Sequence, residues 1–358
     1  MTSVGILGLG TYLPPTVRTN DWWSKEIVAR WSDRMAHQAT RAEAPSSSLT
    51  EGQRLTLAAM AEYASDPFRG AIERRIMSDD MTASQMEAHA ARQAIERAGI
   101  RPEDVDVILS NSPAPDLLMV NNACVTHNLL GLPQRCLALG TDAQCNGLAH
   151  HYSLAAGLIA SGQARYVVSV HSATLTRLTP SSEPHSAWFG DGASAVVFGP
   201  VSDGKGLLAA VHNAAGDRCD ALVIGAGPDK NYWDDGALTV HSVNRESTRN
   251  MLFGMVDRGG IAVTEALARA GLTTSQVDFY ATHQSTAWLT RASAKRARLE
   301  NTNTIVTFPA FANMSSANIP FILAMAEREG MLSDGSVVVT FAGGTGETWS
   351  SLVLRWGR

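Results

Sequence analysis

The chain has 358 residues, of which 45% are hydrophobic and 18% are charged, and its formal net charge is −5. This composition is ordinary for a globular protein and excludes the strong positive charge of a general nucleic-acid binder. The four cysteines are too few for a disulfide scaffold and show no CxxC metal spacing, so we expect no metal and a reducing, cytoplasmic setting.

The N-terminal stretch MTSVGILGLGTYLPP has no basic leader, and its apolar run is too short for a signal peptide or a membrane span. Residues 4–7 predict a short buried strand, after which Gly8 and Gly10 are expected to turn the chain. The triplet GLG is similar to the start of a dinucleotide-binding fingerprint. No helix comes after it, and no acidic residue ends a second strand at the required distance, so a nucleotide site is disfavoured.

Residues 20–66 differ in composition from the rest of the chain. Three tryptophans, Trp22, Trp23 and Trp31, flank a helical pattern. The polar residues 38–53 predict an exposed loop, and residues 55–64 predict a further helix. We interpret this segment as an insertion in the core fold, forming a cap over a pocket.

The two halves of the chain carry similar patterns. Residues 94–106, AIERAGIRPEDVD, align without a gap on residues 266–278, ALARAGLTTSQVD. In the first half, the pattern predicts a helix from Thr82 to Ala98, Gly99 as its C-cap and a strand over 105–109. A second, shorter similarity between the halves follows later helices. The two similarities together indicate internal duplication, with alternating strands and helices in which the strands are apolar and buried. We place the halves at residues 1–200 and 201–358.

Cys145 lies where the apolar run CLALGTDA passes into a predicted buried helix that extends to Gly162. A thiol at a helix N-terminus faces unpaired backbone N–H groups and the positive end of the helix dipole, which favour the nucleophilic thiolate. The alternative is a buried structural cysteine.

Three further features of the second half lie at the ends of predicted strands. These strand ends would meet Cys145 around a pseudo-twofold centre. His283 ends the strand VDFYATH, and Asn313 comes after TIVTFPAFA. The glycine-rich turn AGGTGET, residues 342–348, joins the last two strands, and its backbone N–H groups suit an oxyanion site. His283 by itself would be an ordinary core histidine, and its place opposite Cys145 favours the functional interpretation.

These motifs resemble the ketoacyl-ACP synthase III branch of the thiolase superfamily, in their order and spacing over nearly the whole chain from Asp66. They are DAQCNG, SAWFGDGASAV, THQS, ANMSSANIP and GGTGETWSSLVLRW. The resemblance implies an α/β thiolase-like fold of two duplicated halves in five αβαβα layers, and a homodimer. The exposed-looking apolar stretch PAPDLLMVNNAC, residues 113–124, agrees with a dimer.

The resemblance also implies roles. Cys145, His283 and Asn313 would form the catalytic triad, with Cys145 accepting an acyl group from a CoA or carrier-protein thioester. His283 and Asn313 would stabilise the enolate formed when a second thioester loses CO2. The backbone N–H groups of Cys145 and of Gly344 would hold the oxyanion, and Met119 would reach the partner subunit's pocket. No cofactor is implied beyond the CoA or phosphopantetheine thioester substrate.

The chain departs from the family pattern in three places. DPFRGAIERR stands where Trp-Ile-x-x-Arg-Thr-Gly-Ile is usual, without a counterpart of the tryptophan that stacks on the CoA adenine. HQST replaces HQAN, and Ala312 stands where glycine is usual. Such divergence favours a specialised pathway, of polyketide or fatty-acid-like secondary metabolism, over the housekeeping start of fatty-acid synthesis.

A predicted helix over 286–299 carries one basic face, made of Arg291, Lys295, Arg296 and Arg298. The face is either a solvated surface or, as the resemblance implies, the docking site of an acidic acyl carrier protein. Three functions stay open: a decarboxylating condensing enzyme, an acyltransferase that moves the Cys145-bound acyl group to a hydroxyl or amine with His283 as base, and a non-catalytic subunit. The intact Cys, His and Asn disfavour the third, and Asn313 favours condensation.

Overall fold

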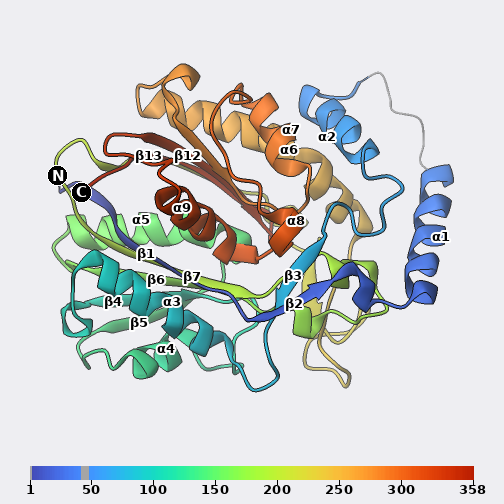
Figure 1. The fold of residues 1–358 in the computed structure, drawn as a ribbon, viewed down its shortest axis with the longest axis horizontal. Coiled ribbons are helices and arrows are strands. Elements are labelled where there is room, and N and C mark those ends of the chain that lie inside the picture. The colour runs from blue at the N-terminus through green and yellow to red at the C-terminus, as the bar shows by residue number, and fades with distance from the viewer. Residues whose placement is uncertain (1, 42–47) are drawn as a thin grey trace.

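The computed structural model describes residues 2–41 and 48–358, and its two large β-sheets lie between layers of helices (Figure 1). The first sheet has the order β1-β7-β6-β4-β5, with bounds Val4–Tyr12, Gly192–Pro200, Val167–Ala173, Val107–Asn111 and Leu137–Thr141. The second has the order β8-β13-β12-β11, with bounds Gly206–Ala214, Thr348–Arg355, Val337–Gly344 and Phe279–Thr282.

Helices complete the five αβαβα layers that the family resemblance implies (Figure 1). Helices α5 (Gly147–Ala160) and α9 (Asn318–Arg328) lie between the two sheets. The outer face of the first sheet is covered by α3 (Ala83–Ala98) and α4 (Asn122–Leu130), and that of the second by α6 (Arg245–Arg269) and α7 (Leu289–Arg296).

The two sheets confirm the predicted duplication. In the first, β1 and β7 are antiparallel, β7 and β6 antiparallel, and β6 and β4 parallel. In the second, β8-β13-β12-β11 repeats this order and polarity. The aligned glycines Gly99 and Gly271 both have positive φ, 70° and 67°, beyond the ends of α3 and α6. The proposed boundary at residues 200 and 201 falls between β7 and β8.

The expected turn at Gly8 and Gly10 is wrong, because β1 continues through both residues to Tyr12. A β-carbon at Gly8 would lie 2.2 Å from the carbonyl oxygen of Ala94, and one at Gly10 would lie 1.9 Å from that of Ala90. The two glycines therefore let α3 pack directly on the bare backbone of the strand.

Residues 20–66 form the short turn Asn20–Trp22 and two helices, α1 (Lys25–Arg41) and α2 (Glu51–Ala61). Trp23 and Trp31 are buried against Phe68, and Trp31 donates a hydrogen bond to the carbonyl of Ser182 at 2.7 Å. Helix α2 begins earlier than predicted, because Thr50 caps it in a capping box with Gln53. The exposed loop predicted over 38–53 lies partly in α1 and α2, and its residues 42–47 lie outside the described part of the chain.

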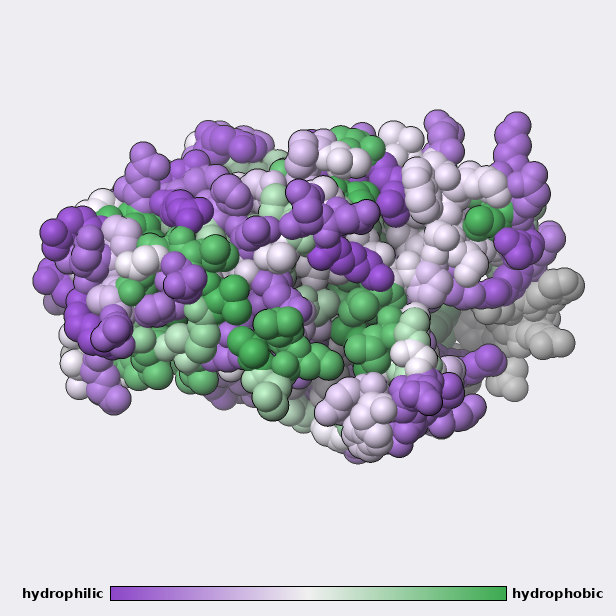
Figure 2. Space-filling view, turned by 90° about the horizontal axis from the view of Figure 1, so that it is seen from below, coloured by the Kyte–Doolittle hydropathy of each residue, from purple (hydrophilic) through white to green (hydrophobic). Residues whose placement is uncertain are grey.

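An apolar surface lies beside the free edge of the first sheet. The edge strand β5 exposes Leu137 and Leu139, and the loop before α4 exposes Leu117, Leu118 and Met119. Figure 2, the view from below Figure 1, shows hydrophobic side chains gathered across this side of the molecule. An unpaired strand edge with exposed apolar side chains is a surface that another chain can cover.

Candidate active site

A pocket with a volume of 680 Å³ brings together the predicted residues from both halves. Cys145 comes after β5, His283 comes after β11, Asn313 precedes α9, and Gly344 ends β12. All four line this pocket, although they lie up to 199 positions apart in the chain.

Cys145 lies in a single 3-10 turn, Gln144–Asn146, immediately before α5. Asn111 at the end of β4 holds this turn: its side-chain nitrogen donates to the Gln144 carbonyl at 2.8 Å, and its side-chain oxygen accepts the Ala143 N–H at 2.8 Å. Gly147 leaves room for this contact, since a β-carbon there would lie 2.6 Å from the Asn111 nitrogen. Sequence reasoning missed Asn111, which has no motif of its own and ends an apolar strand.

The expected low pKa of the Cys145 thiol is wrong. Burial raises the pKa of Cys145 to about 11, although the Ser315 hydroxyl opposes this shift. Burial likewise lowers the pKa of His283 to about 4. The resting pair is therefore a neutral thiol and a neutral imidazole, because loss of hydration disfavours both charged forms.

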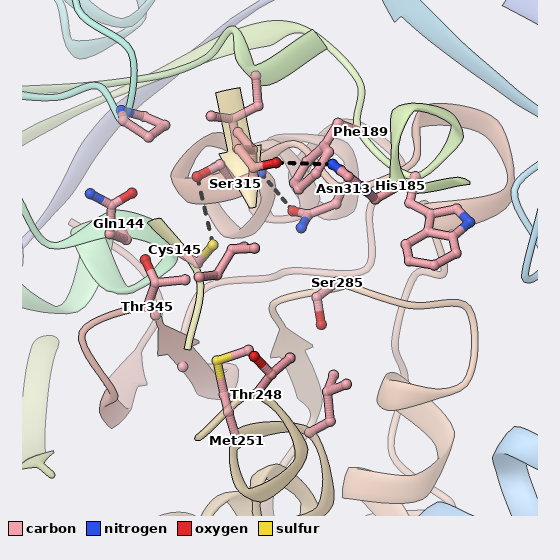
Figure 3. A pocket seen from close by; sticks show the side chains of 18 of the residues that line it. Gln144, Cys145, His185, Phe189, Thr248, Met251, Ser285, Asn313, Ser315 and Thr345 are labelled. Carbon is pink, nitrogen blue, oxygen red and sulfur yellow. Dashed lines mark hydrogen bonds between the residues drawn. The ribbon is translucent and has the colours of Figure 1, made fainter. Parts of the chain in front are cut away.

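Ser315 links Cys145 to Asn313 (Figure 3). Its hydroxyl oxygen lies 3.6 Å from the Cys145 sulfur, and its backbone N–H donates to the Asn313 side-chain oxygen at 2.8 Å. This second bond fixes the orientation of the Asn313 carboxamide and leaves its NH₂ group as the free donor. Ser315, which sequence reasoning also missed, thus organises two of the three predicted catalytic side chains.

Ala312 has a backbone conformation that is typical of glycine. Its φ of 53° and ψ of −154° lie in a region that residues with a side chain rarely adopt. The Asn313 N–H donates to the Trp188 carbonyl at 2.9 Å, so the segment is held against the residues before β7. The departure at Ala312 therefore leaves Asn313 in the pocket.

Both ring nitrogens of His283 are buried without a hydrogen-bond partner among the described residues. The backbone holds the residue in place, because the His283 N–H donates to the Phe341 carbonyl at 2.8 Å. The next side chain, Gln284, accepts the N–H groups of Thr307 and Phe308 and so fastens the loop that leads to Asn313. The imidazole is therefore positioned, with its hydrogen-bonding capacity free for substrate.

Gly344 lies directly beside the backbone of Cys145. A β-carbon at Gly344 would lie 2.9 Å from the Ala143 carbonyl oxygen and 3.3 Å from the Cys145 nitrogen. The turn after Gly344 is anchored by Glu347, whose buried carboxylate pairs with Arg258 of α6. The close approach of the two backbones suits a pair of N–H donors aimed at one oxygen.

The remaining predicted residues lie outside the pocket wall formed by the described chain. Met119 is fully exposed, with a relative accessibility of 104%. Three of the four basic side chains have acidic partners: Arg291 pairs with Glu62, Arg296 with Asp257, and Arg298 with Glu51. The predicted helix over 286–299 is only Leu289–Arg296. The predicted basic face is thus largely neutralised within the chain.

No described residue of the 20–66 segment lines the pocket, and a cap formed by this segment stays a prediction. Its helices pack behind the wall. Sequence reasoning instead missed Arg69, which lines the pocket with its guanidinium 4.4 Å from the centre of the Trp188 ring. Burial lowers the pKa of Arg69, and no ion pair is found for it among the described residues.

Neither a metal cluster nor a membrane span is found in the described residues. No group of three or more His, Cys, Asp or Glu side chains there is arranged to hold a metal ion. Over the same part of the chain, no helix has the length and apolar character to cross a bilayer.

Comparison with known proteins agrees with this geometry. Residues 140–216 match the family model of 3-oxoacyl-[acyl-carrier-protein] synthase III, and residues 267–356 match the model of its C-terminal part. The chain is 30% identical over 357 residues to beta-ketoacyl-[acyl-carrier-protein] synthase III of Bacillus pumilus, covering 99% of this chain and 100% of the relative.

Two solved structures have the same fold. The 3-oxoacyl-[acyl-carrier-protein] synthase III of Aquifex aeolicus superposes with a TM-score of 0.79 at 24% identity, over 99% of this chain and 100% of that one. The priming beta-ketosynthase of the R1128 polyketide pathway superposes with a TM-score of 0.79 at 23% identity, over 99% and 96%.

Proposed function

Because this chain belongs to the beta-ketoacyl-[acyl-carrier-protein] synthase III family, we propose that it forms an acyl thioester on Cys145 and condenses it with a malonyl-type thioester. The observation that carries this proposal is the single pocket in which Cys145, His283 and Asn313 meet, with Ser315 bonded to Asn313 and in contact with the thiol.

In the first step, the Cys145 thiol attacks the carbonyl of the donor thioester. Neutral His283 takes the thiol proton as the sulfur–carbon bond forms, which avoids a free buried thiolate. The carbonyl oxygen becomes an oxyanion, and the N–H groups of Cys145 and Gly344 stabilise it. When the donor's carbon–sulfur bond breaks, the proton passes to the departing thiol.

In the second step, the thioester carbonyl of the malonyl group accepts hydrogen bonds from Asn313 and His283. These two neutral donors stabilise the enolate that forms when the carboxylate leaves as CO2. The enolate carbon then attacks the acyl carbon, the bond to Cys145 breaks, and the sulfur takes up one proton from the solvent.

The thioesters themselves supply all the groups that this reaction needs, so we propose no separate cofactor. Either CoA or a carrier protein presents its acyl group on a phosphopantetheine arm, which carries negative phosphate. Arg69, a cation at the pocket without an acidic partner among the described residues, is suited to such a phosphate.

The test monitors the intact mass of the protein together with CO2 release from a labelled malonyl thioester. Cys145→Ala should form no acyl-enzyme with any member of a panel of acyl thioesters. Asn313→Ala should still form the acyl-enzyme, yet release CO2 about a hundredfold more slowly, which is the typical cost of losing one oxyanion donor.

The same measurement separates condensation from simple acyl transfer. If the protein instead delivers the acyl group to a hydroxyl or amine, His283→Ala should be severely impaired and Asn313→Ala much less so. Product formed in quantity without CO2 release would contradict the proposal.

A further inference from the structure

Two histidines, His151 of α5 and His171 of β6, are completely buried next to the turn that carries Cys145. We propose that His151 is a positioning residue for acylation, and that it acts through Thr141 and Asn111 to fix the peptide group whose N–H belongs to the oxyanion site. His171 supports His151 from behind. The inference rests on the proposed function, because it concerns how the acylation site is held.

The ends of three neighbouring strands place the polar side chains of this network in one row. Asn111, the last residue of β4, is in register with Thr141 of β5 on one side and with His171 of β6 on the other. Ser169 comes two residues before His171 and therefore lies on the same face of β6. Helix α5 places His151 within hydrogen-bond distance of both Thr141 and Ser169.

The hydrogen bonds next to Asn111 have a fixed direction. Burial, together with the neighbouring imidazoles, lowers the pKa of His151, so this ring is neutral and carries one N–H. The Thr141 hydroxyl lies 3.3 Å from the side-chain oxygen of Asn111, which can only accept, so the hydroxyl donates there. The same hydroxyl lies 2.7 Å from Nε2 of His151, which therefore donates to it. Nδ1 of His151 is left as an acceptor.

Ser169 extends the network to His171. Its hydroxyl donates to Nδ1 of His151 at 2.8 Å and accepts from Nε2 of His171 at 2.7 Å. Burial lowers the pKa of His171 to about 3, so this ring is neutral as well. Its Nδ1 has no partner among the described residues and would lie 3.0 Å from a β-carbon at Gly147. Every donor of the network therefore points along it toward Asn111.

Asn111 transmits this order to the backbone of the Cys145 turn. Its side-chain nitrogen donates to the Gln144 carbonyl at 2.8 Å, and the Gly147 N–H donates to the same carbonyl. The C=O and N–H of a planar trans peptide point in opposite directions, so these bonds aim the Cys145 N–H away from Asn111. Gln144 has a φ of 47°, a conformation that residues with a side chain adopt only when the surroundings hold them there.

Packing alone does not require this network. A buried polar group costs free energy unless it is hydrogen-bonded, and an apolar side chain such as leucine could fill the position of His151. The directed bonds instead converge on one carboxamide, that of Asn111, whose two ends hold the Ala143 N–H and the Gln144 carbonyl. The network is thus arranged to keep this carboxamide in one orientation.

The first test measures single-turnover acylation by intact mass over a range of donor thioester concentrations. Thr141→Val removes the hydroxyl and keeps the shape, and His151→Leu removes the N–H. We expect each to slow the maximal rate about tenfold, roughly the effect of one lost hydrogen bond, with the half-saturating donor concentration little changed. His151→Gln keeps an N–H donor and should recover most of the rate.

The matched control is Tyr152→Phe, one residue further along α5. It removes a buried hydrogen bond to the Val4 carbonyl, 3.0 Å long, that lies outside the network, and it should acylate like the wild type. Because Thr141 and His151 act in series, Thr141→Val/His151→Leu should be no slower than Thr141→Val alone, whereas independent effects would multiply.

The second test needs no substrate. Backbone hydrogen exchange over residues 141–147 should be faster in Thr141→Val and His151→Leu than in the wild type, and exchange over residues 313–316 should be unchanged. The inference is overturned if the two variants acylate at the wild-type rate, if Tyr152→Phe is equally slow, if the two effects multiply, or if exchange over 141–147 stays the same. If no thioester acylates the wild type, the proposed function fails instead, and hydrogen exchange alone decides whether the network holds the turn.

Discussion

Burial sets the charge state of the two side chains that react, Cys145 and His283. The pKa of the thiol is raised to about 11 and that of the imidazole is lowered to about 4, both chiefly by loss of hydration. A thiolate–imidazolium pair is therefore not the resting state. The proton must leave the sulfur as the substrate carbonyl is attacked, which makes His283 a general base during acylation.

This charge state predicts a flat pH profile for acylation. His283 gains a proton only below its lowered pKa, and Cys145 loses one only above its raised pKa, so both stay neutral from about pH 5 to about pH 9.5. Single-turnover acylation, measured by intact mass, should show no inflection between these limits and should fall as the pH drops toward 4. An inflection at about 6.5 or about 8.5 would indicate ordinary pKa values and contradict this account.

The close contact between Gly344 and the Cys145 turn predicts that a side chain at position 344 slows acylation. In Gly344→Ala, the new β-carbon would lie 2.9 Å from the Ala143 carbonyl oxygen and push the turn away from the Cys145 N–H. We expect acylation to slow by about a hundredfold, as when an oxyanion donor is lost. The control is Gly157→Ala in α5, where a β-carbon meets nothing within 4 Å. Equal rates in the two variants would show that Gly344 does not support the oxyanion site.

The turn between β12 and β13 is held from behind by a buried ion pair. Glu347 has a φ of 49° and a side chain that is 1% exposed, and it pairs with Arg258 of α6. Burial raises the pKa of Glu347, while Arg258 opposes that shift. Since Gly344 lies three residues away, this pair connects the outer helix to the oxyanion turn.

Removing the carboxylate charge tests the role of this pair. Glu347→Gln leaves Arg258 partly buried without its partner, and we expect the free energy of unfolding to fall by about 3 kcal/mol. Glu265→Gln, which breaks the exposed pair with Arg269 on the same helix, should cost about 0.5 kcal/mol. Urea unfolding measures both. If the turn depends on the pair, Glu347→Gln should also lower the acylation rate at saturating donor, with the donor KM little changed.

Two copies of the chain can cover the apolar surface beside β5. The free strand edge and the exposed side chains of Leu117, Leu118 and Met119 form a surface of the kind that homodimers bury. We therefore expect a homodimer of the 38.2 kDa chain in solution.

A charge placed in this surface should separate the copies. Met119→Glu would have to bury a carboxylate at the contact, so sedimentation at micromolar concentration should show a larger share of monomer than in the wild type. Met331→Glu, at an exposed methionine in the loop after α9, is the matched control. A wild-type monomer, or a Met119→Glu protein that sediments like the wild type, would contradict the dimer.

Local sequence patterns were sufficient to predict the duplicated fold and the residues that meet in the pocket. Residues 94–106 and 266–278 predicted the duplication, because helix ends and turns depend on near neighbours in the chain. The motifs around Cys145, His283, Asn313 and Gly344 predicted the site, because the ends of equivalent strands in two similar halves must face each other. The resemblance to a family added the roles.

Other properties depended on contacts between segments far apart in the chain. The charge state of Cys145 and His283 results from how much protein surrounds them, which no local pattern encodes. The basic face is neutralised by Glu62, 229 positions before Arg291. From the sequence alone, Gly8 and Gly10 predict a turn, whereas in the structure α3 packs on them. Desolvation, ion pairing and close packing are all properties of the surroundings, and the surroundings exist only once the chain has folded.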